Sequence, residues 1–234
     1  MRKTKIVCTI GPASESPEAI RSLMAAGMDV ARLNLSHGTH EEHLARIREV
    51  RAASGESGKH VPVLLDTKGP EIRIGTFSGG SATLERGDSF VLTIERVMGS
   101  KEKVSVSYSR LPEDVAQGDR LLLDDGLIEL AVEEVRAKEV ACRVVVGGTL
   151  GSRKRLSLPG KCVDLPAMSP EDEADLRFGV EHGVDLIAAS FTRKPSDIQE
   201  IREFIRGLGA SIPIIAKIEN KEGLDNLDSI LEVC

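Results

Sequence analysis

Aromatic side chains are scarce in this sequence, which has no tryptophan, a single tyrosine and five phenylalanines in 234 residues. Proteins that bind single-stranded nucleic acids stack the bases on aromatic faces, so such a platform is not expected here. The formal net charge is -6, with acidic and basic residues mixed along the chain, which disfavours nucleic acid or an anionic membrane as a partner. A nucleic-acid-binding β-barrel within residues 74–162 is therefore a remote alternative.

Cysteine pairs and long apolar runs are also missing. The four cysteines, Cys8, Cys142, Cys162 and Cys234, are far apart and form no Cys-x-x-Cys motif, so neither a disulfide framework nor a zinc site is indicated. Reduced thiols fit the cytosol. The apolar run after the charged N-terminal residues covers only positions 6–10, which is too short for a signal peptide or a membrane span. A cytoplasmic protein without a membrane partner is expected.

What the sequence does contain is an alternation of short apolar runs and amphipathic stretches. The runs predict strands, and the stretches between them predict helices, with N-terminal signals at Ser16-Pro17, Thr39 and Ser169-Pro170. Strands are expected at 5–10, 30–35, 61–65, 186–191 and 212–219, and helices at 16–27, 39–53, 169–182 and 195–208. Strands that alternate with helices indicate a parallel sheet.

The alternation is interrupted once. After Arg73, glycine-containing turns divide about 90 residues into short β-branched runs, which predicts an inserted all-β domain. The predicted domains are the first part of an α/β domain at 1–69, the β insertion at 70–165 and the continued α/β domain at 166–234.

An eight-stranded (β/α)8 TIM barrel is the closed α/β fold that gathers reactive groups at the carboxyl ends of parallel strands. Five such strands are predicted here, so about three βα units of a closed barrel are missing. The barrel is therefore expected to be incomplete, with apolar strand edges that favour association. A doubly wound open sheet is the competing fold.

Charged and polar side chains follow the predicted strands. Lys217 and Glu219 lie two residues apart at the end of an apolar run, on one face of a predicted strand. A metal ion and an anionic substrate would balance both charges, and a surface ion pair is the alternative. Arg32, Asn34 and Ser36 share one face of another strand and offer a guanidinium for phosphate beside two oxygen ligands. Alternatively, Ser36 simply caps the following helix.

A rigid turn follows the third predicted strand. Asp66 and Thr67 enter this turn, and Gly69 and Pro70 hold it, although an ordinary domain hinge is the alternative. Phosphoryl transfer needs cations around the moving phosphate, a divalent metal, and groups that hold both in line. The residues that offer these groups at strand ends are Arg32, Asp66, Lys217 and Glu219.

Other segments carry polar groups with less specific chemistry. The strand end at 188–194 includes Ser190 as a candidate substrate contact, or is a plain loop. The basic patch at 151–155 is a solvated face or a phosphate clamp. No dinucleotide-binding or P-loop glycine motif follows a strand. Three evenly spaced histidines, His37, His40 and His43, lie at the start of a predicted polar helix. A solvated helix face is favoured there over a metal site.

The sequence resembles the pyruvate kinase family over essentially its whole length. The matching motifs, in order, are KIVCTIGPAS at 5–14, ARLNLSHGTH at 31–40, LDTKGPEIR at 65–73, DDGLI at 124–128, LPG at 158–160, VDLP at 163–166 and AKIENKEG at 216–223. The resemblance implies a (β/α)8 barrel, the A domain, with a β-rich B domain inserted after its third strand. It also implies phosphoryl transfer between phosphoenolpyruvate and ADP.

The resemblance implies a role for individual residues. Arg32 would contact the substrate phosphate, Lys217 would stabilise the transition state, and Ser190 would lie on the substrate side. Glu219 would be one of two carboxylates that bind Mg²⁺ or Mn²⁺. The implied potassium ligands are Asn34, Ser36, Asp66 and Thr67. The implied nucleotide side consists of Asn34, Leu35, Ser36, His37, Arg73 and Lys154.

The same resemblance also bears on potassium dependence and on whether this chain contains the whole catalytic unit. Glu71 occupies the position where potassium-dependent members carry glutamate and potassium-independent members carry lysine, so dependence on potassium is expected. In the family, the second metal-binding aspartate and a threonine near the substrate come from later segments. This chain alone is therefore expected to bind metal weakly and to turn over little, and the full-length member is expected to be a homotetramer.

Two rival functions remain open. One is a non-catalytic fragment or binding module of the same fold. The other is a different barrel enzyme that acts on phosphorylated carboxylates through a metal-bound enolate.

Overall fold

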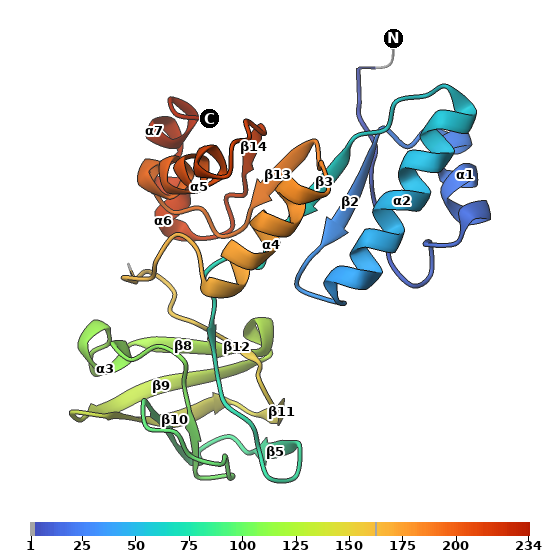
Figure 1. Cartoon of the computed structure of the whole chain (residues 1–234). Helices are drawn as coiled ribbons and strands as arrows, with labels where there is room; N and C mark the ends of the chain where they lie inside the picture. Colours follow the sequence, from blue (N-terminus) through green and yellow to red (C-terminus); the bar gives the residue numbers. More distant parts are fainter. Residues whose placement is uncertain (1–2, 162) are drawn as a thin grey trace. The chain divides into compact units, whose positions relative to one another are not determined.

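The computed structural model describes residues 3–161 and 163–234, so the expected free thiol at Cys162 lies outside the described residues. The chain divides into two compact units. Residues Met1–Pro70 and Pro166–Cys234 form the first, here called the α/β unit, and Glu71–Leu165 form the second, here called the β unit. Figure 1 shows the chain leaving the α/β unit after β3 and returning to it before α4.

The α/β unit is built on a five-stranded parallel sheet in the order β1-β2-β3-β13-β14. The strands are β1 (Val7–Thr9), β2 (Val30–Asn34), β3 (Val63–Asp66), β13 (Leu186–Ala189) and β14 (Ile214–Ala216). Spatial order therefore follows chain order without reversal. A doubly wound sheet reverses at a switch point, whereas a barrel adds each strand beside the previous one. The sheet is thus of the barrel type, and the competing open-sheet fold is wrong.

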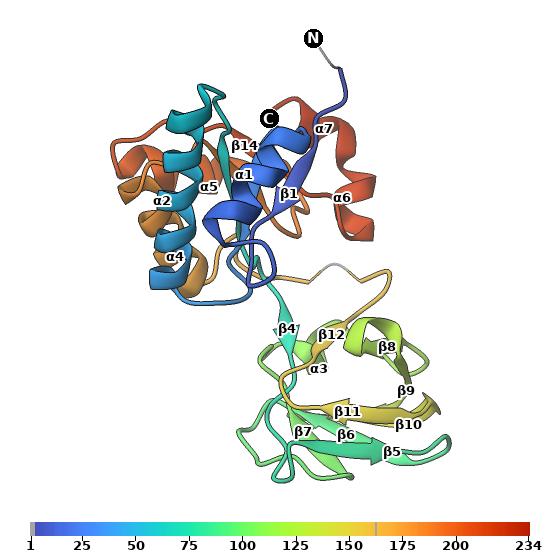
Figure 2. The same cartoon turned by 90° about the vertical axis from the view of Figure 1, so that its right-hand side faces the viewer.

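Helices fill the connections, as Figures 1 and 2 show. Side-chain caps start several of them: Ser16 accepts from the amide of Ala19, and Thr39 and Ser169 each begin a capping box. The helix expected at 39–53 continues to Ser57 and stops at Gly58, whose φ is +64°. The helices are α1 (Pro17–Ala26), α2 (His40–Ser57), α4 (Pro170–Glu181), α5 (Pro195–Gly207), α6 (Lys221–Asp225) and α7 (Leu227–Leu231).

The core of this unit joins strand and helix residues in one apolar cluster. Leu33 and Leu65, from adjacent strands, are fully buried beside Ile20 of α1 and Ile198 of α5. Burial of such side chains is the main source of stability, worth about 2 kcal/mol each. This packing fixes the sheet, and the sheet in turn fixes where its carboxyl ends point.

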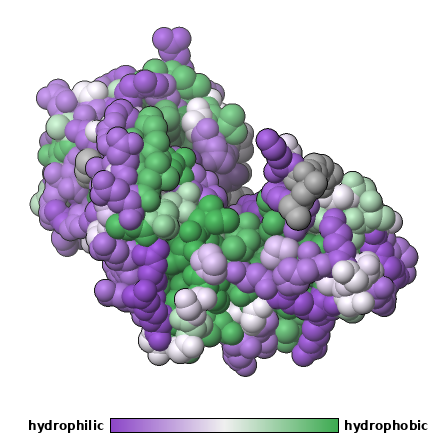
Figure 3. Space-filling model, turned by 90° about the horizontal axis from the view of Figure 1, so that it is seen from above, coloured by the Kyte–Doolittle hydropathy of each residue, from purple (hydrophilic) through white to green (hydrophobic). Residues whose placement is uncertain are grey.

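The two outer strands differ from their sequence-based prediction. Strand 5–10 was expected to be buried, but β1 covers only Val7–Thr9, and Val7 is 50% exposed. At the other edge, β14 is three residues long and Ile215 is 45% exposed. Within the described residues each of these strands has a neighbour on one side only. An unpaired edge of this kind favours association. On the face drawn in Figure 3, hydrophobic residues lie among hydrophilic ones.

The β unit contains a seven-stranded sheet in the order β4-β12-β8-β9-β10-β6-β7 and a two-stranded ribbon, β11-β5. An antiparallel bridge joins Ile74 to Val106, next to the two outer strands, and the amide of Gly75 donates to the carbonyl of Ser105 at 2.8 Å. The sheet is therefore closed into a barrel around its own core. Its elements are β4 (Ile72–Arg73), β5 (Ser81–Leu84), β6 (Ser89–Thr93), β7 (Lys103–Ser105), α3 (Leu111–Asp114), β8 (Arg120–Leu123), η1 (Asp124–Gly126), β9 (Ile128–Val135), β10 (Glu139–Val146), β11 (Gly148–Gly151) and β12 (Arg155–Ser157).

No helix in the described part of the chain combines the length and the hydropathy needed to cross a membrane.

Candidate functional site at the carboxyl ends of the parallel strands

Asp66, the last residue of β3, is the centre of a charged cluster. Its Oδ2 accepts from Arg32 Nε at 2.7 Å and lies 2.6 Å from Arg32 Nη2. Its Oδ1 accepts from Lys217 Nζ at 3.0 Å and from Ser190 Oγ at 3.1 Å. One carboxylate thus holds a guanidinium on one oxygen and an ammonium on the other.

Strand register brings these residues together. Asn34 of β2 pairs with Asp66, and Asp66 pairs with Ala188 of β13. Lys217 follows directly after β14, and its amide donates to the carbonyl of Ala189 at 3.0 Å. Parallel strands in register end at the same edge of the sheet, so side chains far apart in sequence meet there.

Glu219 is attached to the cluster through Lys217. Its Oε1 lies 3.3 Å from Lys217 Nζ, and its Oε2 accepts from the amide of Phe191 at 3.0 Å. The prediction placed Lys217 and Glu219 on one face of a strand, but β14 ends at Ala216, so both lie in the segment after it. The pair still converges, because the segment after β14 is held to the loop after β13 by the amide of Thr192, which donates to the carbonyl of Lys217.

Burial differs sharply between the charges of the cluster. The side chain of Asp66 is 2% exposed, whereas those of Arg32 and Lys217 are 31% and 28% exposed. The buried carboxylate fixes the two cations from below, and their remaining surface faces solvent. Two partly exposed cations held at a fixed spacing can receive an anion such as a phosphate group or a carboxylate.

Removal of the central charge is expected to destabilise the α/β unit. Asp66→Asn should lower the free energy of unfolding by about 2 kcal/mol, less than a wholly buried ion pair loses, because both cations keep part of their hydration. Urea denaturation of the 234-residue chain measures this change. Asp225→Asn, at an exposed ion pair with Lys221, is the matched control and should cost little. Equal values for the two variants would contradict the central role of Asp66.

The turn after β2 brings polar groups to the same edge. Asn34 Oδ1 accepts from the amide of Ser36 at 3.1 Å, and the amide of His37 donates to the carbonyl of Asn34 at 3.3 Å. The amide of Leu35 donates to the carbonyl of Asp66, while the Leu35 side chain is buried in the core. Leu35 can therefore meet a ligand only through its backbone.

Thr67 is buried beside this turn. Its Oγ1 donates to the carbonyl of Ala188 at 3.3 Å, and its carbonyl accepts from Ser190 Oγ at 2.7 Å. The predicted potassium ligands Asn34, Asp66 and Thr67 thus lie on adjacent, register-paired strand ends, with Ser36 in the turn beyond.

The turn from Lys68 to Pro70 is fixed by α4. The amide of Gly69 donates to Oδ1 of Asp172 at 2.9 Å, and Asp172 is itself buried in the α4 capping box. Gly69 has a φ of +72°, and a methyl group added there would lie 2.6 Å from the carbonyl oxygen of Ser190. Only glycine fits this position, so the turn is held in one conformation at the point where the chain leaves the α/β unit.

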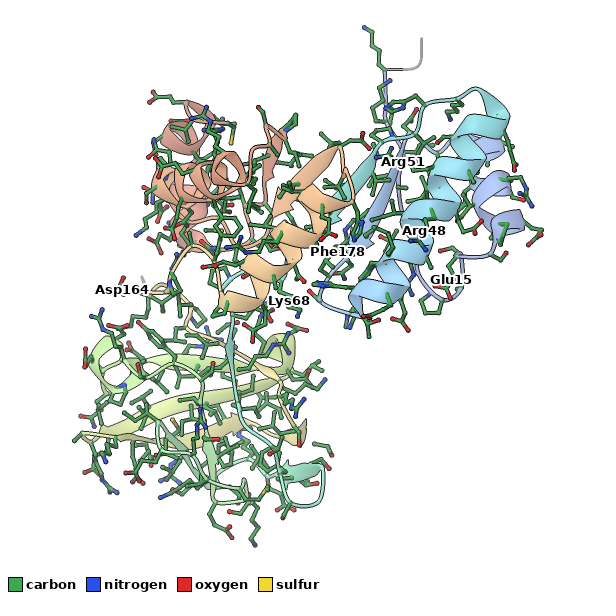
Figure 4. The ribbon with its side chains drawn as sticks, in the orientation of Figure 1. Glu15, Arg48, Arg51, Lys68, Asp164 and Phe178 are labelled. Atoms are coloured by element: carbon green, nitrogen blue, oxygen red, sulfur yellow. The ribbon has the colours of Figure 1, made fainter. Side chains whose placement is uncertain are left out.

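His40 and His43, two of the three evenly spaced histidines, differ in their surroundings. His40 Nε2 lies 2.6 Å from Oδ1 of Asp175, and its ring stacks on Phe178 with centroids 4.5 Å apart. Figure 4 shows Phe178 on α4, on the side toward α2. Burial raises the pKa of the Asp175 carboxyl. His43 is 1% exposed, so the expectation of a solvated histidine face is wrong for this residue.

The remaining candidates, Arg73 and Lys154, belong to the β unit. Arg73 Nη1 donates to the carbonyl of Arg153 at 2.8 Å and pairs with Glu71, and Lys154 Nζ lies 2.8 Å from Asp124 Oδ1. Arg153 has a φ of +60°. In the basic patch at 151–155, Lys154 and Arg155 therefore form ion pairs with acidic residues of the β unit, and Arg153 has a backbone conformation that non-glycine residues seldom adopt.

Two contacts of the cluster were missed from the sequence. Thr9, at the end of β1, accepts from Arg32 Nη1 at 2.7 Å through its hydroxyl. Its position at a strand end was the available signal. Phe191 binds Glu219 with its backbone amide and has a φ of +56°, and nothing in a phenylalanine indicates such a role.

These observations define an α/β protein of the barrel type with a charged site at the strand ends. A family model described as pyruvate kinase, barrel domain, matches residues 1–234. The chain therefore belongs to the pyruvate kinase family, and the predicted fold class, an incomplete (β/α)8 barrel with a β insertion, is confirmed.

Individual relatives support the same family. The pyruvate kinase of Bacillus licheniformis is 52% identical over 236 residues, and that of Staphylococcus aureus strain MRSA252 is 52% identical over 235 residues. Both alignments cover 100% of this chain and 40% of the relative, so the chain spans about 40% of the length of the curated relatives it matches.

Proposed function

We propose that these residues belong to a cytoplasmic pyruvate kinase of glycolysis, which transfers the phosphoryl group of phosphoenolpyruvate to ADP and gives pyruvate and ATP. The observation that carries the proposal is the pair of partly exposed cations, Arg32 and Lys217, fixed around the buried carboxylate of Asp66. Phosphoryl transfer depends mainly on positioning and on stabilisation of charge, and fixed cations supply both.

In this proposal Arg32 and Lys217 hold the phosphoryl group from two sides. The bond from phosphorus to the enol oxygen breaks, and a bond to a terminal oxygen of the ADP β-phosphate forms. Lys217 lies between Ser190 Oγ, at 2.8 Å, and Asp66, so its ammonium needs no rearrangement to stabilise the charge that develops on the enolate. The enolate then takes one proton to become pyruvate. Ser190 would lie on the substrate side.

The nucleotide would lie against Asn34, Leu35, Ser36 and His37, with Arg73 and Lys154 as further cationic contacts. The amide group of Asn34 and the hydroxyl of Ser36 suit phosphate and ribose oxygens. Phosphoenolpyruvate and ADP or ATP are thus the proposed partners, with neither nucleic acid nor membrane, and the full-length protein is proposed to be a homotetramer.

Glu219 fits a divalent metal that arrives with substrate. Among the described residues there is no group of three or more His, Cys, Asp or Glu side chains that could hold a metal ion. Mg²⁺ is commonly bound by one or two carboxylates together with substrate phosphates, and Glu219 supplies one carboxylate. When bound, Mg²⁺ or Mn²⁺ neutralises charge on the phosphates. A single protein carboxylate supports weak metal binding and little turnover by this chain alone.

A monovalent cation suits the donor set beside Asp66. Asn34, Ser36, Asp66 and Thr67 present amide, hydroxyl and carboxylate oxygens, which are the ligands of hard cations. We therefore propose K⁺ at this position.

In a version of the chain extended to the length of its relatives, replacing potassium by another monovalent cation is expected to remove most of the pyruvate kinase activity. Without K⁺ the carboxylate and amide oxygens lose a cation that helps to order them, and Na⁺ or tetramethylammonium is expected not to restore the rate. Pyruvate formation at constant ionic strength measures the effect. An unchanged rate in tetramethylammonium would contradict the potassium site and leave the assigned reaction untouched.

One assay tests the reaction itself. Pyruvate formation from phosphoenolpyruvate and ADP, with Mg²⁺ and K⁺, is coupled to lactate dehydrogenase for the 234-residue chain and for a version extended to the length of its relatives. Activity in the extended protein supports the proposal, and activity only there shows that the catalytic unit needs further residues. Phosphate release without nucleotide favours a different barrel enzyme. Inactivity in both favours a non-catalytic binding module.

A further inference from the structure

A buried chain of polar groups lies under the turn that follows β2. His43 of α2 is 1% exposed, and its Nε2 lies 2.8 Å from the carbonyl oxygen of His37. Its Nδ1 lies 3.3 Å from Nη1 of Arg46, and Nε of Arg46 donates to Oε2 of Glu15 at 2.7 Å. Glu15 follows β1, and Figure 4 shows it beside α2. The chain of contacts thus connects the loop after β1 to the turn after β2.

The chemistry of these partners fixes the protonation of the ring. A guanidinium can only donate hydrogen bonds, so Nδ1 of His43 must accept from Arg46. The ring is then neutral and carries its proton on Nε2, which donates to the carbonyl of His37. Desolvation by burial lowers the pKa of His43 and outweighs the hydrogen bond to the His37 carbonyl, which raises it; Arg46 lowers the pKa as well, while Asp175 and Glu42 raise it. The hydrogen-bond geometry and the direction of the pKa shift thus both favour a neutral ring.

The turn itself is pressed closely onto α2. Gly38 has a φ of +85°, and a methyl group added there would lie 2.7 Å from Oε2 of Glu42 and 3.4 Å from Nε2 of His43. Glu42 also accepts from the amide of Thr39 at 3.0 Å. The turn therefore lies against the side chains of Glu42 and His43, and the hydrogen bond from His43 Nε2 ties the His37 carbonyl directly to α2.

We propose that His43 is a positioning residue, which through its Nε2–H fixes the His37 carbonyl and with it the 34–37 turn that would receive the nucleotide. Arg46 and Glu15 hold the ring in the required tautomer. The inference rests on the proposed function only for the identity of the ligand, because the geometry of the hydrogen bonds is independent of it.

The first test needs no activity. Nitrogen-15 NMR of the imidazole groups in the 234-residue chain reports the tautomer and charge of each histidine. We expect a neutral His43 ring at pH 7 with its proton on Nε2, because Nδ1 accepts from Arg46. A proton on Nδ1, or a charged ring at pH 7, would overturn the proposal.

The second test uses steady-state kinetics of the extended protein. His43→Leu removes the donor and should raise the KM for ADP by about tenfold, the effect of one lost hydrogen bond, with a KM for phosphoenolpyruvate within about twofold of the original. His43→Gln keeps an N–H near the position of Nε2 and should restore most of the affinity. Arg46→Met should act like a milder His43→Leu.

The control for these variants is Arg48→Met. Arg48 is an exposed residue of the same helix, labelled in Figure 4, and its replacement should change neither constant. If His43→Leu leaves the KM for ADP unchanged, or if His43→Gln is as impaired as His43→Leu, the positioning role is wrong. If the unaltered extended protein is inactive, the proposed function fails, and the NMR result still decides the tautomer. A His43→Leu protein that does not fold leaves the decision to His43→Gln and Arg46→Met.

Discussion

Lys217→Met in the extended protein is expected to lower kcat for pyruvate formation by about 10³-fold, the effect of losing one preorganised charge at the transition state. Lys217 contacts Asp66, Ser190 and Glu219 within 3.3 Å, so its ammonium is already placed when substrate arrives. The coupled assay gives kcat and both KM values. The KM for phosphoenolpyruvate should change far less than kcat, because an interaction made mainly in the transition state affects turnover.

The matched control is Lys221→Met. Lys221 lies four residues further on, is largely exposed and pairs with Asp225 on α6, so its loss should leave kcat within about twofold. Equal losses of kcat in the two variants would indicate a structural effect of this segment. A kcat that survives Lys217→Met would remove the catalytic assignment of the residue.

Gly69→Ala is expected to lower the free energy of unfolding of the α/β unit by about 3 kcal/mol. Two costs add here: the positive φ of +72° and a methyl group 2.6 Å from the carbonyl oxygen of Ser190. Neither Gly69 nor Ser190 can move away easily. The Gly69 amide donates to Asp172, and the Ser190 hydroxyl bonds to Asp66 and to the Thr67 carbonyl. Far-ultraviolet circular dichroism in urea follows the transition, since the longer helices all belong to this unit.

Gly58→Ala separates the two costs. Gly58 has a φ of +64° at the end of α2, with no atom within 4 Å of an added methyl group. It therefore reports backbone strain alone, expected at about 1 kcal/mol. If Gly69→Ala and Gly58→Ala cost the same, the close approach to Ser190 is not a constraint.

The sequence allowed the site cluster to be predicted because it depends on strand ends. Asp66 and Lys217 each follow an apolar run, and parallel strands in register must bring such positions to one edge. The lengths of the runs were less informative. Residues 212–219 read as one strand, but β14 ends at Ala216, because neighbouring strands determine where pairing stops.

Buried polar contacts were the part that the sequence could not predict. His43 sits in a polar stretch and gave the pattern of a solvated helix face, but its burial depends on Arg46 and on the carbonyl of His37. Phe191 contributes a backbone amide to Glu219, which side-chain type does not encode. The contact of Phe191 joins residues 28 positions apart, whereas His37 and Arg46 lie close to His43 in sequence, but a polar pattern does not show that the ring is buried between them.

The closed barrel of the β unit affects the order in which the chain can fold. Strands β3 and β13 pair directly, Leu64 with Leu186, although the whole β unit lies between them in sequence. Closing so long an unfolded loop is entropically costly and slow. Where the chain enters and leaves the β unit, β4 and β12 pair, Ile72 with Leu156, so the folded unit holds its own ends close together. If it folds first, only residues 67–71 and 158–185 remain between β3 and β13 outside the paired ends, so the folded insertion shortens the loop that their pairing must close.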